Sequence, residues 1–225
     1  MLLLLLGCPK APVVPSLPVT EVPELRPPEK PSLDEEYNAA AVAVMRGDVA
    51  GALAAITTFE ADYGTTPYAD TVRSWRDDAL RIGTPAPPLV VTRWVQGSAN
   101  FADHPLTLLV FFEPWCPHCQ EEVPAFQPLV EEYGPKGLGV VAITAMTRGA
   151  TEEMLGQFIE LGGLKFPVGI EGGAMSEAYG VVGVPHLVFV RGDTVVWAGS
   201  AGMITLDLVN TLLEGRPLPL PLPTP

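Results

Sequence analysis

The stretch FFEPWCPHCQEEVP, residues 111–124, carries two cysteines, Cys116 and Cys119, separated by Pro117 and His118. Such a pair can belong to a metal site, a structural disulfide or a redox-active dithiol. A structural zinc site needs four ligands, and the remaining Cys and His residues form no second pair. A disulfide that closes so short a loop removes little entropy from the unfolded chain. The spacing therefore favours a redox-active pair that needs no metal and no other cofactor.

The charge of the chain excludes one class of partner. The 225 residues have a formal net charge of −13. A chain this acidic repels phosphate, so we do not expect it to bind nucleic acid. The length suits one core domain of ordinary size with a smaller module beside it.

The first eight residues, MLLLLLGC, indicate export. Leu5-Leu6-Gly7-Cys8 resembles the bacterial lipobox, in which the cysteine carries lipid. The leucine run is too short to cross a bilayer, which takes about 20 apolar residues. A signal peptide normally begins with basic residues, and none precedes Cys8, so we expect the true start upstream. We predict a periplasmic or cell-envelope protein anchored to the membrane through Cys8; the alternative is a chance apolar stub with an ordinary cysteine.

Composition divides the chain into five segments: a signal-like segment at 1–8, a Pro-rich linker at 9–32, an Ala-rich helical module at 33–82, an α/β domain at 83–214 and a Pro-rich tail at 215–225. Both Pro-rich segments should be extended. Within the module, apolar spacing and capping residues predict helices at 34–46, 48–63 and 68–82. The second helix and its flanks resemble half of a tetratricopeptide repeat. Because such arrays need about three repeats, we favour a helical hairpin that packs on the next domain.

The α/β domain alternates strand and helix signals. The predicted strands are 89–95, 106–112, 138–144, 186–191 and 194–198, and the predicted helices are 117–133, 151–161, 174–179 and 205–213. The runs at 106–112 and 138–144 are almost continuously apolar, as expected for buried central strands. This alternation predicts a largely parallel sheet covered on both faces, with the last two strands antiparallel.

Several motifs occur in one order and spacing: GTPAPP at 83–88, WCPHC at 115–119, Pro124, and FPVGI…AYGVVGVPHLVFV at 166–190. Together they resemble the TlpA/ResA-type branch of thioredoxin-fold thiol–disulfide oxidoreductases over residues 83–214. The resemblance implies a thioredoxin-like α/β fold for these residues, which follow the predicted helical module. It also implies a helix kink at Pro124 and a cis-proline, Pro185, that faces the cysteines.

The two cysteines should have different roles. Pro117 suits the first turn of a helix, so Cys116 should lie at the helix N-terminus, where free N–H groups stabilise a thiolate. We therefore expect Cys116 to be exposed and to attack, and Cys119 to be more buried and to resolve the mixed disulfide. Val110 stands where thioredoxins have a buried Asp. The resemblance assigns the proton relay for Cys119 to Glu122 instead.

The neighbours of the motif also have predicted places. Glu122 has the alternative of being a solvated helix carboxylate, as we expect for Glu121. We predict a substrate groove formed by Trp115, Pro117, His118 and Val184, with the Val184 backbone free to pair with a substrate strand. Glu113 and Pro114 are interpreted as loop surface. His186 either perturbs the site or faces the core.

The direction of electron flow stays open between two arguments. Pro-His between the cysteines resembles the oxidant DsbA, whereas TlpA/ResA-type proteins are mostly reductants. We expect a reductant of exported protein disulfides, supplied by a membrane redox partner. The alternatives are a DsbA-like oxidant, a binding or assembly lipoprotein with a redox fold, and a peroxiredoxin-like peroxidase. The peroxidase lacks support because Glu113, not Thr, stands three residues before Cys116.

Overall fold

The computed structural model describes residues 30–219. The predicted lipid attachment at Cys8, the signal-like segment and nearly all of the Pro-rich linker lie outside the described residues, as does the end of the tail. Between residues 30 and 219 no helix is both long and apolar enough to cross a membrane.

Three helices open the described chain: α1 (Leu33–Met45), α2 (Val49–Tyr63) and α3 (Ala69–Arg81). Side chains fix where two of them begin. The Ser32 hydroxyl accepts the backbone N–H of Glu35, and the Asp48 carboxylate accepts that of Gly51 at 2.9 Å. Between α1 and α2, Gly47 has a φ of +68°, a conformation that favours glycine. The three predicted helices are confirmed, with ends that differ by at most one residue.

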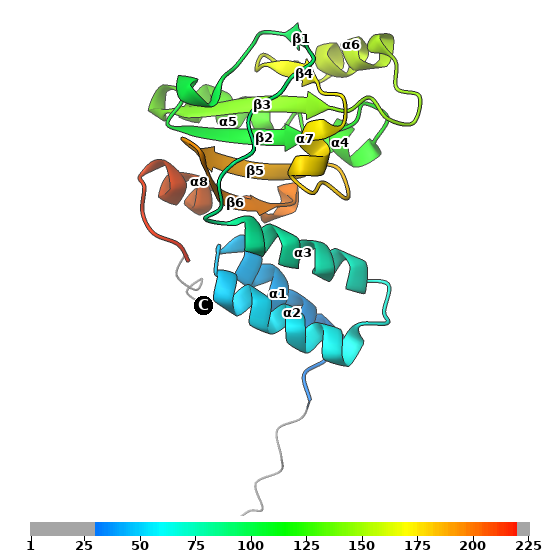
Figure 1. Ribbon diagram of the computed structural model, residues 1–225, viewed down its shortest axis with the longest axis vertical. Coiled ribbons are helices and arrows are strands. Elements are labelled where there is room, and N and C mark those ends of the chain that lie inside the picture. Colours follow the sequence, from blue (N-terminus) through cyan, green and yellow to red (C-terminus); the bar gives the residue numbers. More distant parts are fainter. Residues whose placement is uncertain (1–29, 220–225) are drawn as a thin grey trace, which may run out of the picture. The chain divides into compact units, whose positions relative to one another are not determined.

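A mixed sheet follows, drawn as arrows in Figure 1. Its strands are β1 (Arg93–Gln96), β2 (Leu106–Phe111), β3 (Leu138–Thr144), β4 (Val168–Ile170), β5 (His186–Arg191) and β6 (Thr194–Gly199). They run in the order β1-β4-β3-β2-β5-β6. The pairs β2–β3 and β3–β4 are parallel, whereas β5, β6 and β1 join antiparallel. Every residue of β2 and β3 is buried, which confirms their prediction as central strands.

Helices cover both faces of the sheet (Figure 1). They are α4 (Pro117–Glu122), α5 (Phe126–Tyr133), α6 (Glu152–Leu161), α7 (Ala174–Ala178) and α8 (Leu206–Leu213). Short 3-10 helices lie at Phe101–Asp103, Gly134–Lys136 and Ala201–Met203. The larger core joins one sheet face to α4, α5, α6, α8 and the three N-terminal helices. The smaller core lies on the other face, beneath α7.

Two predicted elements differ from the structure. The single helix expected at 117–133 is two helices, α4 and α5, because Pro124 between them lacks an N–H and its ring crowds the preceding turn. The strand expected at 89–95 begins only at Arg93. The Val90 N–H donates to the Met175 sulfur at 3.2 Å, and the Tyr179 hydroxyl donates to the Pro87 carbonyl. The residues before β1 therefore bond to α7 and its C-terminal end and not to a neighbouring strand.

The N-terminal helices pack on the sheet as part of one compact unit that begins at Pro31. The fully buried Trp197 of β6 donates its indole N–H to the Val44 carbonyl of α1 at 3.1 Å. The segment after α3 exchanges two backbone hydrogen bonds with Val195, one from Gly83 and one to Thr84. These contacts hold α3 against β6, the strand at one edge of the sheet.

Candidate active site

The cysteine motif lies where β2 ends and α4 begins. Cys116 is the N-cap of α4, and Pro117 occupies its first turn. The loop before it is tied down twice: the Cys116 N–H donates to the Glu113 carbonyl at 3.0 Å, and the Gln120 amide donates to the Pro114 carbonyl at 2.9 Å. The Cys116 sulfur is therefore held at the N-terminal end of a helix dipole, which favours a negative charge.

Both cysteines are buried, free thiols. Cys119 has no exposed surface and Cys116 is 5% exposed, so the expectation of an exposed Cys116 is wrong. The cause is the loop before β5, because the Cys116 thiol donates to the Val184 carbonyl at 3.4 Å. The Val184–Pro185 peptide bond is cis, as the sequence pattern predicts. The loop that carries Val184 and Pro185 therefore covers the Cys116 sulfur.

Burial raises the pKa of the Cys119 thiol well above its ordinary value. A hydrogen bond from the Glu113 backbone opposes the rise, while the side chain of Cys116 and the charge of Glu122 add to it. Cys119 therefore stays protonated until a base removes its proton. Glu122 is half-buried and within electrostatic range of that thiol, whereas Glu121 is exposed.

Glu113 and Pro114 are buried, which corrects their interpretation as loop surface. Glu113 is only 4% exposed, and its carboxylate accepts the backbone N–H of Thr147 at 3.0 Å. This bond ties the loop after β3 to the loop before Cys116. The sequence offered one sign that Glu113 is buried: it directly follows the apolar strand at 106–112, where the chain is still inside the protein.

A cleft of about 650 Å³ opens beside the cis-proline. Of the predicted site residues, His118, Glu122, Val184 and Pro185 line it. Four others do not. Cys116 and Cys119 are buried next to the cleft and not in its lining. Pro117 lies exposed at the start of α4, and Trp115 is covered by the Arg148 guanidinium, which sits 4.3 Å from the indole centre. The opposite wall consists of residues of α1 and α3, so the helical module forms part of the cleft.

Sequence reasoning missed one contact in this cleft. Asp78 of α3 and His186, the first residue of β5, are both buried, and the Asp78 Oδ1 lies 3.6 Å from the His186 Nε2. Burial raises the pKa of Asp78 to about 7, with Arg81 opposing, and lowers the pKa of His186 to about 4. Between those two pH values both groups are neutral, so the contact is not an ion pair. His186 thus faces the cleft rather than the core.

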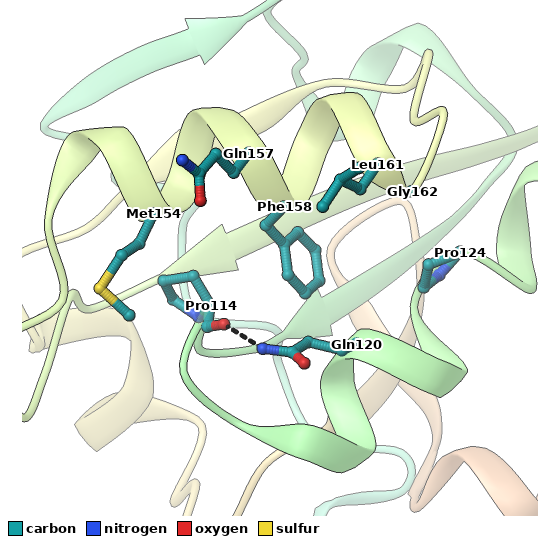
Figure 2. A pocket seen from close by; sticks show the side chains of 8 residues that line it. All are labelled: Pro114, Gln120, Pro124, Met154, Gln157, Phe158, Leu161 and Gly162. Atoms are coloured by element: carbon teal, nitrogen blue, oxygen red, sulfur yellow. Dashed lines mark hydrogen bonds between the residues drawn. The ribbon is translucent and has the colours of Figure 1, made fainter.

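A second hollow, of about 410 Å³, lies between α4 and α6 (Figure 2). Figure 2 shows Phe158 and Leu161 of α6 on one side and Pro114, Gln120 and Pro124 on the other. None of the residues that line it carries a titratable side chain. We therefore place the thiol chemistry in the cleft beside Pro185.

Comparisons with known proteins agree with this geometry. The AhpC/TSA family matches residues 82–198, more than half of the chain. The thiol-disulfide oxidoreductase ResA of Bacillus thuringiensis subsp. konkukian is 31% identical over 142 residues, which cover 62% of this chain and 80% of that protein. The sporulation thiol-disulfide oxidoreductase A of Bacillus subtilis is 25% identical over 109 residues, covering 48% and 66%.

Solved structures show the same fold. The thioredoxin domain of the thiol-disulfide oxidoreductase BVU-2223 from Bacteroides vulgatus superposes with a TM-score of 0.50 at 21% identity, covering 60% of this chain and 98% of that domain. A thioredoxin-like protein solved in its oxidized form gives a TM-score of 0.53 at 19% identity, with coverage of 60% and 98%.

Proposed function

Because the chain belongs to the AhpC/TSA family and is a ResA-like thiol–disulfide oxidoreductase with a thioredoxin fold, we propose that it reduces disulfides of exported proteins through Cys116 and Cys119. One observation carries the proposal. The Cys116 thiol lies at the N-terminus of α4 and contacts the carbonyl of Val184, directly before the cis-proline Pro185. In this proposal Cys116 is the nucleophile, α4 activates it, and the loop with Val184 and Pro185 receives the substrate.

The chemistry takes two exchanges. The Cys116 thiolate attacks one sulfur of a substrate disulfide, so that a mixed disulfide forms, the substrate S–S bond breaks and the other substrate sulfur leaves as a thiolate. Cys119, once deprotonated, attacks the Cys116 sulfur and releases the second substrate thiolate. The substrate gains two electrons and two protons, and the enzyme is left with a Cys116–Cys119 disulfide. A dithiol partner, which we place in the membrane, must then reduce it.

The second exchange needs a base because burial holds Cys119 in the thiol form. Glu122 is the carboxylate whose charge acts on that thiol, and it lines the cleft through which a proton can leave. We assign it the relay: it accepts the Cys119 proton as the sulfur attacks and passes it to solvent.

The charges near the motif favour the reductant over the oxidant. A nearby cation stabilises the thiolate and so the reduced form, which makes a pair more oxidising. The imidazole between the two cysteines, His118, is exposed, and water screens charges at such a position. Glu122 acts in the opposite sense, because its negative charge disfavours a thiolate on Cys119. The reduced pair therefore gives up its electrons more readily than the Pro-His dipeptide implies.

The location rests on the sequence. The lipobox-like Leu5–Cys8 and the Pro-rich spacer after it support an extracytoplasmic enzyme held to a membrane by lipid on Cys8. The spacer would keep the cleft away from the bilayer surface, within reach of exported proteins.

Trapping in cells tests the proposal. The Cys119→Ala variant of the full chain should accumulate mixed disulfides with envelope proteins, seen as thiol-sensitive bands, because Cys116 attacks but nothing resolves the product. The Cys116→Ser variant is the matched control and should trap none. Equal trapping by both variants, or none by either, would contradict the proposed role of Cys116.

A further inference from the structure

The cleft beside the cysteines has one wall from each part of the molecule. From the helical module it is lined by α1 and α3, through Tyr37, Trp75 and Asp78 among others. From the redox domain it is lined by Val184 and its neighbours, and the Val184 carbonyl accepts the Cys116 thiol. A polypeptide that follows this loop to Cys116 must therefore pass along α3.

The permanent charges on these walls are negative. Asp77 of α3 and Glu122 of α4 line the cleft beside the buried Asp78 and the exposed His118, and among its described lining residues there is no Lys or Arg. Burial keeps the cleft's His186 neutral at pH 7 by lowering its pKa to about 4. The cation closest to Asp78, Arg81, donates to the Ala178 carbonyl and does not line the cleft.

A buried polar atom in the same wall also lacks a partner. His186 is 9% exposed, and its Nε2 makes no hydrogen bond to any described residue, since the Asp78 oxygen at 3.6 Å is too far. Buried polar groups in native structures are nearly always hydrogen-bonded. A polypeptide lying in the cleft would supply the missing partner through its backbone.

We propose that α1 and α3 are part of the substrate-binding surface, and that the cleft selects extended polypeptide segments with a Lys or Arg close to the substrate cysteine. The proposal rests on the proposed function and adds a substrate class to it. The carboxylates attract the cation, and the buried His186 and Asp78 offer hydrogen-bonding positions to the backbone. The role of the helical module is then recognition at the site of chemistry.

Two synthetic peptides test this selection. Each carries one cysteine as a mixed disulfide with thionitrobenzoate, and they differ only in having Lys or Glu on either side of that cysteine. Release of the chromophore by the reduced full-length enzyme gives the rate of attack. We expect the Lys peptide to react about tenfold faster at low salt, the size of one or two partly exposed ion pairs, and the ratio to approach one at 1 M salt.

Charge reversal on α3 makes the test specific. Asp77 is exposed in the cleft, so Asp77→Lys should fold normally and lower the Lys-to-Glu rate ratio at least about threefold. Asp70→Lys is the matched control: it makes the same charge change on the same helix, outside the lining of the cleft, and should leave the ratio unchanged. Equal rates for the two peptides, a preference for Glu, or equal effects of both variants would overturn the selection.

An uncharged small disulfide, hydroxyethyl disulfide, separates the two proposals. If the enzyme reduces it but does not distinguish the peptides, the substrate selection fails and the proposed function stands. If the enzyme reduces neither the small disulfide nor a peptide, the proposed function itself fails.

Discussion

Replacement of Asp78 by Asn should change how the stability of the protein depends on pH. Asp78 lies in the cleft wall with its carboxyl 3.6 Å from His186, and its burial raises its pKa from 3.8 to about 7. The folded protein thus binds a proton between those pH values that the unfolded chain has released. Stability from this group is fully present below pH 3.8 and is lost as the pH rises to about 7.

The magnitude follows from the two pKa values. They differ by about 3, which corresponds to about 4 kcal/mol of unfolding free energy. Asp78→Asn removes this loss, so its stability relative to wild type should rise by about 4 kcal/mol between about pH 3 and pH 8. The contribution of His186 to stability depends on pH in the opposite direction. Burial lowers its pKa from 6.5 to about 4, so the folded protein loses this stability as the pH falls. His186→Gln should therefore lose about 3 kcal/mol relative to wild type from pH 4 to pH 6.5.

Urea unfolding of wild type and both variants at closely spaced pH values measures these differences. Only the slope against pH matters, so a constant cost of either substitution does not affect the test. A pH-independent difference for Asp78→Asn, or slopes of the same sign for the two variants, would refute a buried neutral carboxyl and imidazole in this cleft.

Three further changes have definite expected outcomes. Glu122→Gln should slow the attack of Cys119 on the mixed disulfide about 100-fold, because the base is lost; rapid-quench kinetics measures this step, and an equal effect of the exposed Glu121→Gln would exclude a specific relay. Trp197→Phe should cost about 1–3 kcal/mol in urea unfolding, because the Val44 carbonyl loses its buried donor; unchanged stability would mean that this bond does not hold α1 on the sheet. Cys8→Ser should abolish labelling with a fatty-acid analogue in cells, and labelling that persists would contradict the anchor.

Much of the fold was predictable from local signals. Almost continuous apolar runs identified β2 and β3, since a strand buried on both faces carries few polar side chains; the exceptions here are Thr107 and Thr144. The order of WCPHC, Pro124 and the Val-Pro-His segment located the cysteines at a helix start opposite a cis-proline. These signals depend on short stretches of sequence, and the structure agrees with them.

Other features depend on contacts between distant segments, and sequence reasoning missed them. Cys116 is buried because the Val184 loop closes over it. Asp78 and His186 are more than 100 residues apart in the sequence, and they meet only because α3 packs beside the sheet. A carboxylate in a loop is usually exposed, whereas Glu113 is buried because its carboxylate accepts the Thr147 N–H.

The reduction potential of the Cys116–Cys119 pair, measured against glutathione with the full chain, tests the central claim most directly. We predict a single two-electron transition, near the value of about −270 mV that is typical of thioredoxin. A potential of about −120 mV, typical of DsbA, would contradict the proposal that the protein acts as a reductant. Failure of the two cysteines to form a disulfide at any potential would contradict the redox assignment itself.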